Sequence, residues 1–365
     1  MENHLAQESH LASVSRVRSP RRFRIALAVM LAGLLAGEVV LQGRAYLKTG
    51  RSAAALASGE TVVAMNEAYG VRTYRPNFSL KRTDPGYRFV TNSHGLRSPE
   101  IPAKRAPGEY RIIVSGASTV AGVYAHTNEL TFPGQLQALF SETASGPVNV
   151  VNAGVEGYAV KDMERLIDRA LIKQDPSMMV IYSGFVDLST ICGRMRAAKT
   201  KPQSAPVANL PHWVMTRQLI SKNTLALREP PIRLGIIDPA DHFPQSYPET
   251  LDRIVTKLKK AGVVPVLVTS ARSYRGLPDA QAAKLAESPL FFYSCLDLAG
   301  LNKASELFNQ AVSDVARKHK VQLIDLANVM PPGREYFVDA NHFTRKGDRK
   351  AAEIIHAVLA GVIKH

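Results

Sequence analysis

Cysteine is scarce in this chain, which has only Cys192 and Cys295 among its 365 residues. Their separation matches neither CxxC nor a metal-ligand spacing, so a disulfide, two free thiols or neither all stay open. No HExxH, GxGxxG or GxSxG pattern occurs, and the segment 116–122 lacks the lysine of a P-loop. We therefore expect no metal and no cofactor, and the α/β-hydrolase fold is disfavoured.

The composition also lacks a strong bias, with 45% hydrophobic and 21% charged residues. These values are typical of globular proteins and exclude a disordered or fibrous chain. The formal net charge is +15 and the pI is near 9.8, which would attract nucleic acids, anionic membranes or acidic glycans. Beyond the N-terminus the lysines and arginines are dispersed, so we expect no nucleic-acid partner.

One long hydrophobic run covers residues 25–41 and is apolar apart from Glu38. It can just cross a hydrocarbon core, which needs about 17–25 residues, and Glu38 near its outer end can reach the interface. The arginines that precede it would stay cytoplasmic: Arg16, Arg18, Arg21, Arg22 and Arg24. We predict a basic cytoplasmic tail (1–24), a single-pass anchor in the inner membrane (25–43) and a periplasmic remainder, where a disulfide is possible.

Three alternatives to the anchor are a cleaved signal peptide, an interfacial helix and a buried core helix. Cleavage is disfavoured by the length of the run and by the lack of a small-x-small site directly after it, although residues 53–57 keep that option open. Residues 44–109 show no strong periodicity and are rich in turn residues, such as Asp84-Pro85-Gly86. This part is predicted to be a stalk and an irregular lead-in segment.

From Tyr110 onward, short apolar runs alternate with amphipathic helical stretches. The runs predicted as strands are 110–115, 148–152, 178–183, 263–269 and 321–326. The clearest predicted helices cover 248–261 and 345–363. Strands that alternate with helices pair in parallel and bury both faces. The prediction is a three-layer α/β/α domain over 110–365 with a five-stranded parallel sheet. Its insertion at about 189–248, with Arg194, Arg196 and Trp213, is predicted to be a lid or binding surface.

Polar motifs follow four of these strands, at the sheet edge where parallel sheets bind ligands. They are Ser115-Gly116-Ala117-Ser118-Thr119, Asn152-Ala153-Gly154, Gly184-Phe185-Val186-Asp187 and Asp339-Ala340-Asn341-His342. Their order resembles the four blocks of the SGNH or GDSL hydrolase superfamily, which implies a flavodoxin-like domain. The segment Asn92-Ser93-His94-Gly95-Leu96-Arg97 is similar to the lead-in of membrane-anchored bacterial members.

The resemblance implies a serine nucleophile. Ser118 would attack an ester carbonyl, His342 would take and return its proton, and Asp339 would orient the imidazole. The backbone N–H groups of Ser118 and Gly154 would form the oxyanion hole. We place Asp187 and Asn341 among the substrate-binding residues.

Two positions depart from the family pattern. Block I reads Gly-Ala-Ser-Thr instead of Gly-Asp-Ser, and Val186 stands where block III has asparagine. An isopropyl group cannot donate a hydrogen bond, so Asn341, Asn152 or another group supplies the missing donor, or the site is weak or inactive.

Each site residue also has a structural alternative. Ser118 could cap the helix after the first strand, and Asp339 with His342 could cap the last helix. Gly154 could only permit a tight turn, and for Asp187 we favour holding a loop over function.

The prediction is an extracytoplasmic serine esterase that cleaves acyl or acetyl esters on a surface glycan or lipid. One alternative is an O-acyltransferase acting on a polysaccharide, since transfer needs only an acceptor hydroxyl that reacts with the acyl group faster than water does. The other is a catalytically silent glycan-binding scaffold, which Val186 supports. Whether the chain has a protein partner stays open at this point.

Overall fold

The centre of the molecule is a five-stranded parallel sheet with the strand order β6-β5-β7-β8-β9. The computed structural model describes residues 20–49, 62–81, 86–193 and 235–363. The sheet strands are β5 (Tyr110–Gly116), β6 (Val148–Gly154), β7 (Met178–Tyr182), β8 (Val264–Val268) and β9 (Gln322–Ile324). All five lie within or next to the apolar runs of the sequence, so the predicted parallel sheet is confirmed.

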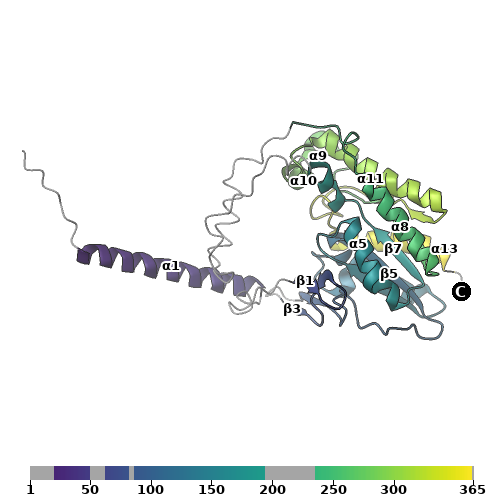
Figure 1. Cartoon of the computed structure of the whole chain (residues 1–365), viewed down its shortest axis with the longest axis horizontal. Helices are drawn as coiled ribbons and strands as arrows, with labels where there is room; N and C mark the ends of the chain where they lie inside the picture. Colours follow the sequence, from purple (N-terminus) through teal and green to yellow (C-terminus); the bar gives the residue numbers. More distant parts are fainter. Residues whose placement is uncertain (1–19, 50–61, 82–85, 194–234, 364–365) are drawn as a thin grey trace, which may run out of the picture.

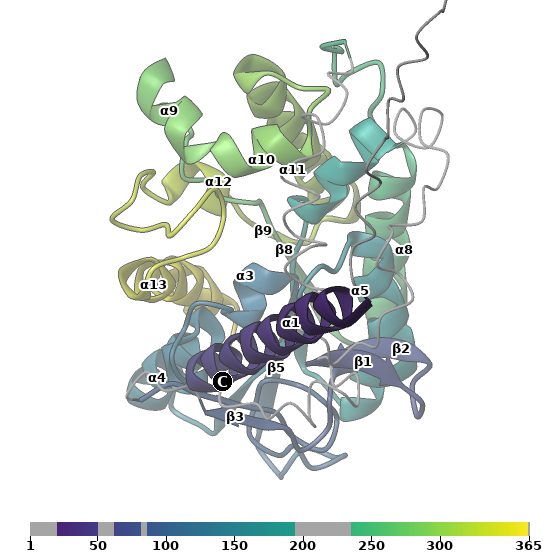
Figure 2. The same ribbon diagram turned by 90° about the vertical axis from the view of Figure 1, so that its left-hand side faces the viewer.

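Helices cover both faces of this sheet (Figures 1 and 2). The helices of the domain are α3 (Ser118–Ala121), α4 (Phe132–Thr143), α5 (Val160–Leu166), α8 (Ser246–Lys260), α9 (Asp279–Leu285), α10 (Glu287–Phe292), α11 (Leu298–His319), α12 (Leu326–Val329) and α13 (Arg345–Val362). Shorter helical turns are η1 (Asn128–Leu130), η2 (Ile167–Leu171), η3 (Ile172–Gln174) and η4 (Val186–Leu188).

The two faces of the sheet have separate hydrophobic cores because side chains alternate along each strand. On one face, Ile113, Met179 and Leu267 pack with α5, α8 and α11. On the other face, Ile112 and Val180 pack with α4 and α13. The result is the predicted three-layer α/β/α arrangement.

The lead-in segment is more ordered than the sequence indicated. It forms two antiparallel hairpins, β1 (Val63–Asn66) with β2 (Val71–Tyr74) and β3 (Ser79–Lys81) with β4 (Arg88–Val90). Tyr74, Tyr87 and Phe89 form a small core with Ala121 of α3. The expectation of an irregular segment is therefore wrong for this part, and these hairpins pack directly on the domain.

Helix α1 (Pro20–Thr49) projects away from the domain (Figure 1). Its stretch Arg24–Arg44 has a mean hydropathy of 2.1 and is long and apolar enough to cross a membrane, a test that a signal sequence also passes. None of its most hydrophobic window is buried against the protein, so the buried core helix is excluded. Residues 53–57 lie outside the described residues.

Cys192 and Cys295 form a disulfide, which resolves the question left open by the sequence. Cys192 lies in a helical segment shortly after η4, and Cys295 lies between α10 and α11. The bond therefore ties the chain after β7 to the region before α11. Arg194, Arg196 and Trp213 of the predicted insertion lie outside the described residues.

Candidate active site

Ser118 is the first residue of α3, a four-residue helix that directly follows β5 and Ala117. Its side chain does not cap this helix: Ala117 is the N-cap, and no side-chain cap hydrogen bond forms there. The Ser118 Oγ instead lies 2.7 Å from His342 Nε2. Because Ser118 is only 8% exposed, this contact is shielded from competing water.

His342 and Asp339 lie on the loop before α13. One Asp339 oxygen is 2.7 Å and the other 2.9 Å from His342 Nδ1. The backbone N–H groups of Asn341 and His342 also donate to Asp339 Oδ1, at 3.1 and 2.9 Å. The N-cap of α13 is Thr344, whose side chain accepts from Gly347 N–H, so Asp339 and His342 do not cap that helix.

The protonation states follow from these contacts. Burial acts to raise the pKa of the Asp339 carboxyl, but hydrogen bonds and charge from His342, with the backbone N–H groups, together hold this pKa below its ordinary value. An ionised carboxylate only accepts, so His342 Nδ1 carries the hydrogen. Nε2 then has its lone pair free to accept the Ser118 hydroxyl proton, which is the geometry of a serine activated by a base.

Gly154 lies at the end of β6, beside the start of α3. A Cβ at Gly154 would stand 2.2 Å from Ala121 N and 2.7 Å from the Val120 carbonyl carbon, so only glycine allows the strand and α3 to approach this closely. Its N–H donates to Asn152 Oδ1 at 3.0 Å. The Gly154 N–H, which we expected to point at the oxyanion, is thus already hydrogen-bonded to another residue of the chain.

Neither asparagine considered as a substitute for the block III donor is free. Asn152 Nδ2 donates to the Val120 carbonyl at 2.9 Å. Asn341 is 5% exposed, and its Nδ2 donates to Thr119 Oγ1 at 3.0 Å. Asn341 therefore joins the His342 loop to the residue after Ser118, and its placement among the substrate-binding residues stays a prediction.

Asp187 also serves the scaffold. Its carboxyl is buried and accepts from Val160 N–H at 3.0 Å, which ties η4 to the first turn of α5. Burial raises the pKa of Asp187 to about 6, and the N–H donors oppose this shift only in part. These bonds are those of a residue that holds a loop, the role that the sequence favoured, and the placement among substrate-binding residues stays a prediction.

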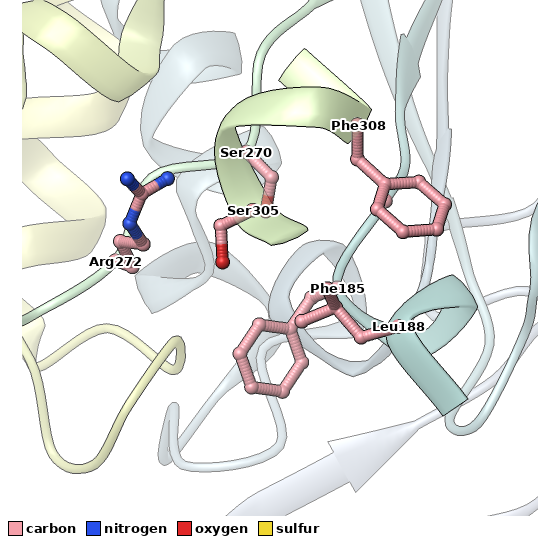
Figure 3. Close-up of a pocket in the computed structure, with 7 residues that line it drawn as sticks. Phe185, Leu188, Ser270, Arg272, Ser305 and Phe308 are labelled. Atoms are coloured by element: carbon pink, nitrogen blue, oxygen red, sulfur yellow. The ribbon is translucent and has the colours of Figure 1, made fainter. Parts of the chain in front are cut away.

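The block III loop also borders a small cavity, shown in Figure 3 between this loop, the end of β8 and α11. Its lining includes Phe185, Leu188, Ser270 and Phe308. The volume is about 10 Å³, room for about one water molecule. An acyl group does not fit there, so this cavity is not an acyl pocket.

Tyr124 stands beside the candidate triad and was missed in the sequence. Its ring meets the His342 ring edge-on at 5.4 Å, and its hydroxyl is 3.5 Å from Asp339 Oδ2. Burial, followed by the negative charge of Asp339, raises the pKa of the Tyr124 hydroxyl, so it stays protonated and able to donate. Half of Tyr124 is exposed, which makes it part of the surface around Ser118. No motif marks it, because it lies on a loop with irregular sequence.

Comparisons with known proteins point to one family. The sequence model of the GDSL-like Lipase/Acylhydrolase family matches residues 114–350, more than half of the chain. No match was found among curated proteins. Solved structures of similar fold include a lipase/acylhydrolase from Enterococcus faecalis, 18% identical, with a TM-score of 0.43 over 70% of this chain and 97% of that one. Another is the psychrotrophic esterase EstA from Pseudoalteromonas sp., 13% identical, with a TM-score of 0.42 over 70% of this chain and 99% of that one.

Proposed function

Because this chain belongs to the GDSL-like lipase/acylhydrolase family, we propose that it is a membrane-anchored serine esterase that cleaves acyl or acetyl esters outside the cytoplasm. The observation that carries the proposal is the chain of contacts from Ser118 Oγ to His342 Nε2 and from His342 Nδ1 to Asp339, each at 2.7 Å. Four short sequence blocks far apart in the chain contribute to this one edge of the sheet. A surface glycan or lipid is the substrate class that fits the proposed location.

In the proposed reaction, His342 Nε2 takes the proton of Ser118 as Oγ attacks the ester carbonyl carbon. The protonated His342 then gives this proton to the leaving alcohol, and an acyl-serine forms. Water attacks the acyl-serine in the second half, with His342 again as base, and the acid is released. Asp339 keeps the imidazole in the required tautomer and stabilises its charged form throughout.

The oxyanion of the intermediate would face the backbone N–H of Ser118. Because Gly154 N–H is accepted by Asn152, we place the second donor on the loop after β6. This loop starts beside β5, where Val155 N–H donates to the Gly116 carbonyl at 3.0 Å. Gly157 has a φ of +78°, and its N–H has no acceptor within the described part of the chain. We assign the second donor to Gly157.

The proposed location rests on α1 and on the disulfide. An exposed apolar helix preceded by arginines is typical of a single-pass anchor with a cytoplasmic N-terminus. Disulfides persist in oxidising compartments, which fits a periplasmic domain. A reporter enzyme fused after His365 that is active only outside the cytoplasm should be active, and activity of a cytoplasm-only reporter would contradict the location.

The catalytic proposal is tested with a fluorophosphonate, which reacts with an activated serine. The full chain in detergent should be labelled, Ser118→Ala should not, and Ser141→Ala, at an exposed serine of α4, should be labelled as fast as wild type. His342→Ala should slow labelling strongly without lowering the melting temperature by more than a few degrees. Labelling of Ser118→Ala at the wild-type rate would refute the proposal.

Val186 supports a second candidate, a glycan-binding scaffold without catalysis. Both asparagines that could replace the missing donor are engaged elsewhere, so neither completes an oxyanion hole. A folded wild type that is inert to the fluorophosphonate, yet binds a polysaccharide, would favour this candidate over the esterase.

A further inference from the structure

The segment 92–97 forms a compact turn that the esterase proposal leaves without a role. Asn92 Oδ1 accepts from the N–H groups of His94 and Leu96, both at 3.0 Å, and Asn92 Nδ2 donates to the Pro99 carbonyl at 3.0 Å. Its backbone N–H donates to the Leu96 carbonyl at 2.9 Å. One asparagine side chain thus fixes the path of the whole turn.

Gly95 allows this turn to lie against β2. Its φ is +74°, and a Cβ there would stand 2.1 Å from the Tyr74 carbonyl oxygen, so a larger residue is excluded by both conformation and space. Leu96 is buried in the core next to it. The turn is therefore rigid, and it delivers Arg97 to a fixed place.

Arg97 reaches from this turn to the C-terminal end of α3. Its Nη1 donates to the carbonyls of Ala121, at 2.9 Å, and Gly122, and its Nη2 donates to the Ala125 carbonyl at 2.9 Å. Its Nε donates to Asn128 Oδ1 at 3.0 Å, and the guanidinium lies over the Phe89 ring, 4.5 Å from its centroid. The side chain is 1% exposed.

A helix of four residues has little stability of its own, because its end carbonyls lack partners inside the helix. Here the planar guanidinium supplies those partners and also places a positive charge at the negative end of the helix. Asn152 holds the Val120 carbonyl of the same helix. The position of Ser118, one turn away, therefore depends on groups that bond the far end of α3.

We infer that Arg97 is a positioning residue for the nucleophile, and that the turn 92–97 is part of the catalytic centre although it precedes the family match at residue 114. This inference rests on the proposed function only for its effect on reactivity. The ordering of α3 by Arg97 stands apart from it.

The guanidinium of Arg97 donates to neutral oxygens and not to a carboxylate. Within the described residues no carboxylate lies in ion-pair distance of Arg97. Asp348, the first carboxyl that acts on it electrostatically, has a pKa raised well above the ordinary value by burial, and it accepts from Phe132 N–H at 3.0 Å. A buried guanidinium without a paired anion costs desolvation. Its four hydrogen bonds and the ring contact offset this cost, so the site is built for a guanidinium.

Arg111 provides a matched control. It is also fully buried, donates to the Pro102 carbonyl at 2.8 Å and pairs with Glu109 at 2.9 Å. It lies at the start of β5, at the opposite end of the strand from Ser118. A variant at Arg111 removes a similar amount of buried bonding without touching α3.

The experiment compares full-length wild type, Arg97→Ala, Arg97→Lys and Arg111→Ala in detergent, by hydrogen exchange of backbone amides and by fluorophosphonate labelling. We expect faster exchange of the amides of residues 118–125 in both Arg97 variants, with exchange of β5 unchanged. Labelling should slow about 100-fold in Arg97→Ala, the effect that a shift of about 1 Å can have. Arg97→Lys, whose ammonium reaches fewer acceptors, should slow it about tenfold, and Arg111→Ala should stay within about twofold of wild type.

Methylguanidinium added to Arg97→Ala should restore part of the labelling rate, and methylammonium should not. Unchanged exchange over 118–125 in a folded Arg97 variant would overturn the inference, as would slowing by Arg111→Ala equal to that by Arg97→Ala. If Arg97→Ala fails to fold, Arg97→Lys is compared with wild type and Arg111→Ala in its place. A wild type that is inert to the probe contradicts the esterase proposal, and the exchange result still decides the role of Arg97.

Discussion

Val186 lies in η4, at the position where block III of the SGNH or GDSL superfamily has an asparagine. With Asn152 and Asn341 engaged in other hydrogen bonds, the oxyanion would be held by backbone donors alone. We therefore predict slow hydrolysis of small esters by the wild type. Val186→Asn should raise the turnover of a model acetyl ester by up to about 10²–10³, the contribution of one such donor.

Val186→Ala is the control for this substitution, because it changes the side-chain volume without adding a donor. An equal gain from both variants would show that space and not hydrogen bonding limits the rate. No gain from Val186→Asn, in a protein that labels with the fluorophosphonate, would show that the backbone donors suffice.

Asp187 makes stability depend on pH. Its folded-state pKa is raised to about 6, above the ordinary value of 3.8, so the folded state binds more protons than the unfolded state between these values. Protonation of Asp187 therefore contributes fully to the free energy of unfolding below about pH 4. This contribution is lost as the pH rises through about 6, and the loss is at most about 3 kcal/mol. Asp187→Asn keeps an acceptor for Val160 N–H and has no charge.

The measurement is the melting temperature of wild type and Asp187→Asn between pH 4 and 8. We expect the variant to gain stability relative to wild type as the pH rises through this window, and the difference to level off above about pH 7. A difference that does not change with pH would refute the raised pKa.

At this scale the sequence pointed to Ser118, Asp339 and His342 as a candidate triad because each stands in a short motif next to a strand or helix signal, and the three side chains are in contact. It could not assign the hydrogen bonds of Asn341, Asn152 and Gly154, since these depend on which polar groups meet across the folded loops. Those three residues fit the family pattern equally well as substrate contacts or as scaffold. Only the distances separate the two roles.

Among the elements, the sheet strands were predictable because each lies within or next to a short apolar run of the sequence. The hairpins β1–β2 and β3–β4 were not, since their strands have three or four residues and alternate poorly between apolar and polar side chains. They are held by contacts with distant residues, such as Val90 with Asn128, whose side chain bonds both the Val90 N–H and carbonyl at 3.3 and 2.8 Å. Local sequence carries no signal for such contacts.

The disulfide acts on the elements around the insertion. Cys192 and Cys295 are 103 positions apart, so the bond restricts a long loop in the unfolded chain, which stabilises a folded domain by about 2–4 kcal/mol in typical cases. We predict that the double variant Cys192→Ser with Cys295→Ser has a free energy of unfolding lower by about this amount. Urea unfolding with and without a reductant measures it.

Reductant should bring the wild type down to the level of the double variant and should leave the variant unchanged. Equal stability of the two proteins under oxidising conditions would show that the bond does not restrict the unfolded chain. Fluorophosphonate labelling should persist in the double variant, because neither cysteine contacts Ser118 or His342.

The molecule as a whole separates into an apolar helix and a domain with its own cores. The hydrophobic clusters of the sheet and the hairpins contain none of residues 24–44, the part of α1 whose side chains are described. Apolar side chains there, such as Leu35 and Val39, are 68% and 69% exposed. This exposure is unfavourable in water and favourable in a bilayer. The apolar run in the sequence was enough to predict a long apolar helix here, and its role as a membrane anchor stays a prediction.

The last prediction concerns this separation. A chain that lacks residues 1–49 should be recovered in the soluble fraction, while the full chain should stay with membranes at high salt, because burial of apolar surface and not charge would hold it there. The melting temperature of the domain should be the same in both, since residues 24–44 of α1 take no part in its cores. A variant with Leu34→Arg and Leu35→Arg is the control, because two arginines at the centre of the helix disfavour insertion at about 2.5–3.5 kcal/mol each without shortening the chain.

A lower melting temperature of the truncated chain would show that α1 packs on the domain. Release of the full chain by salt alone would show a surface attachment instead of an anchor.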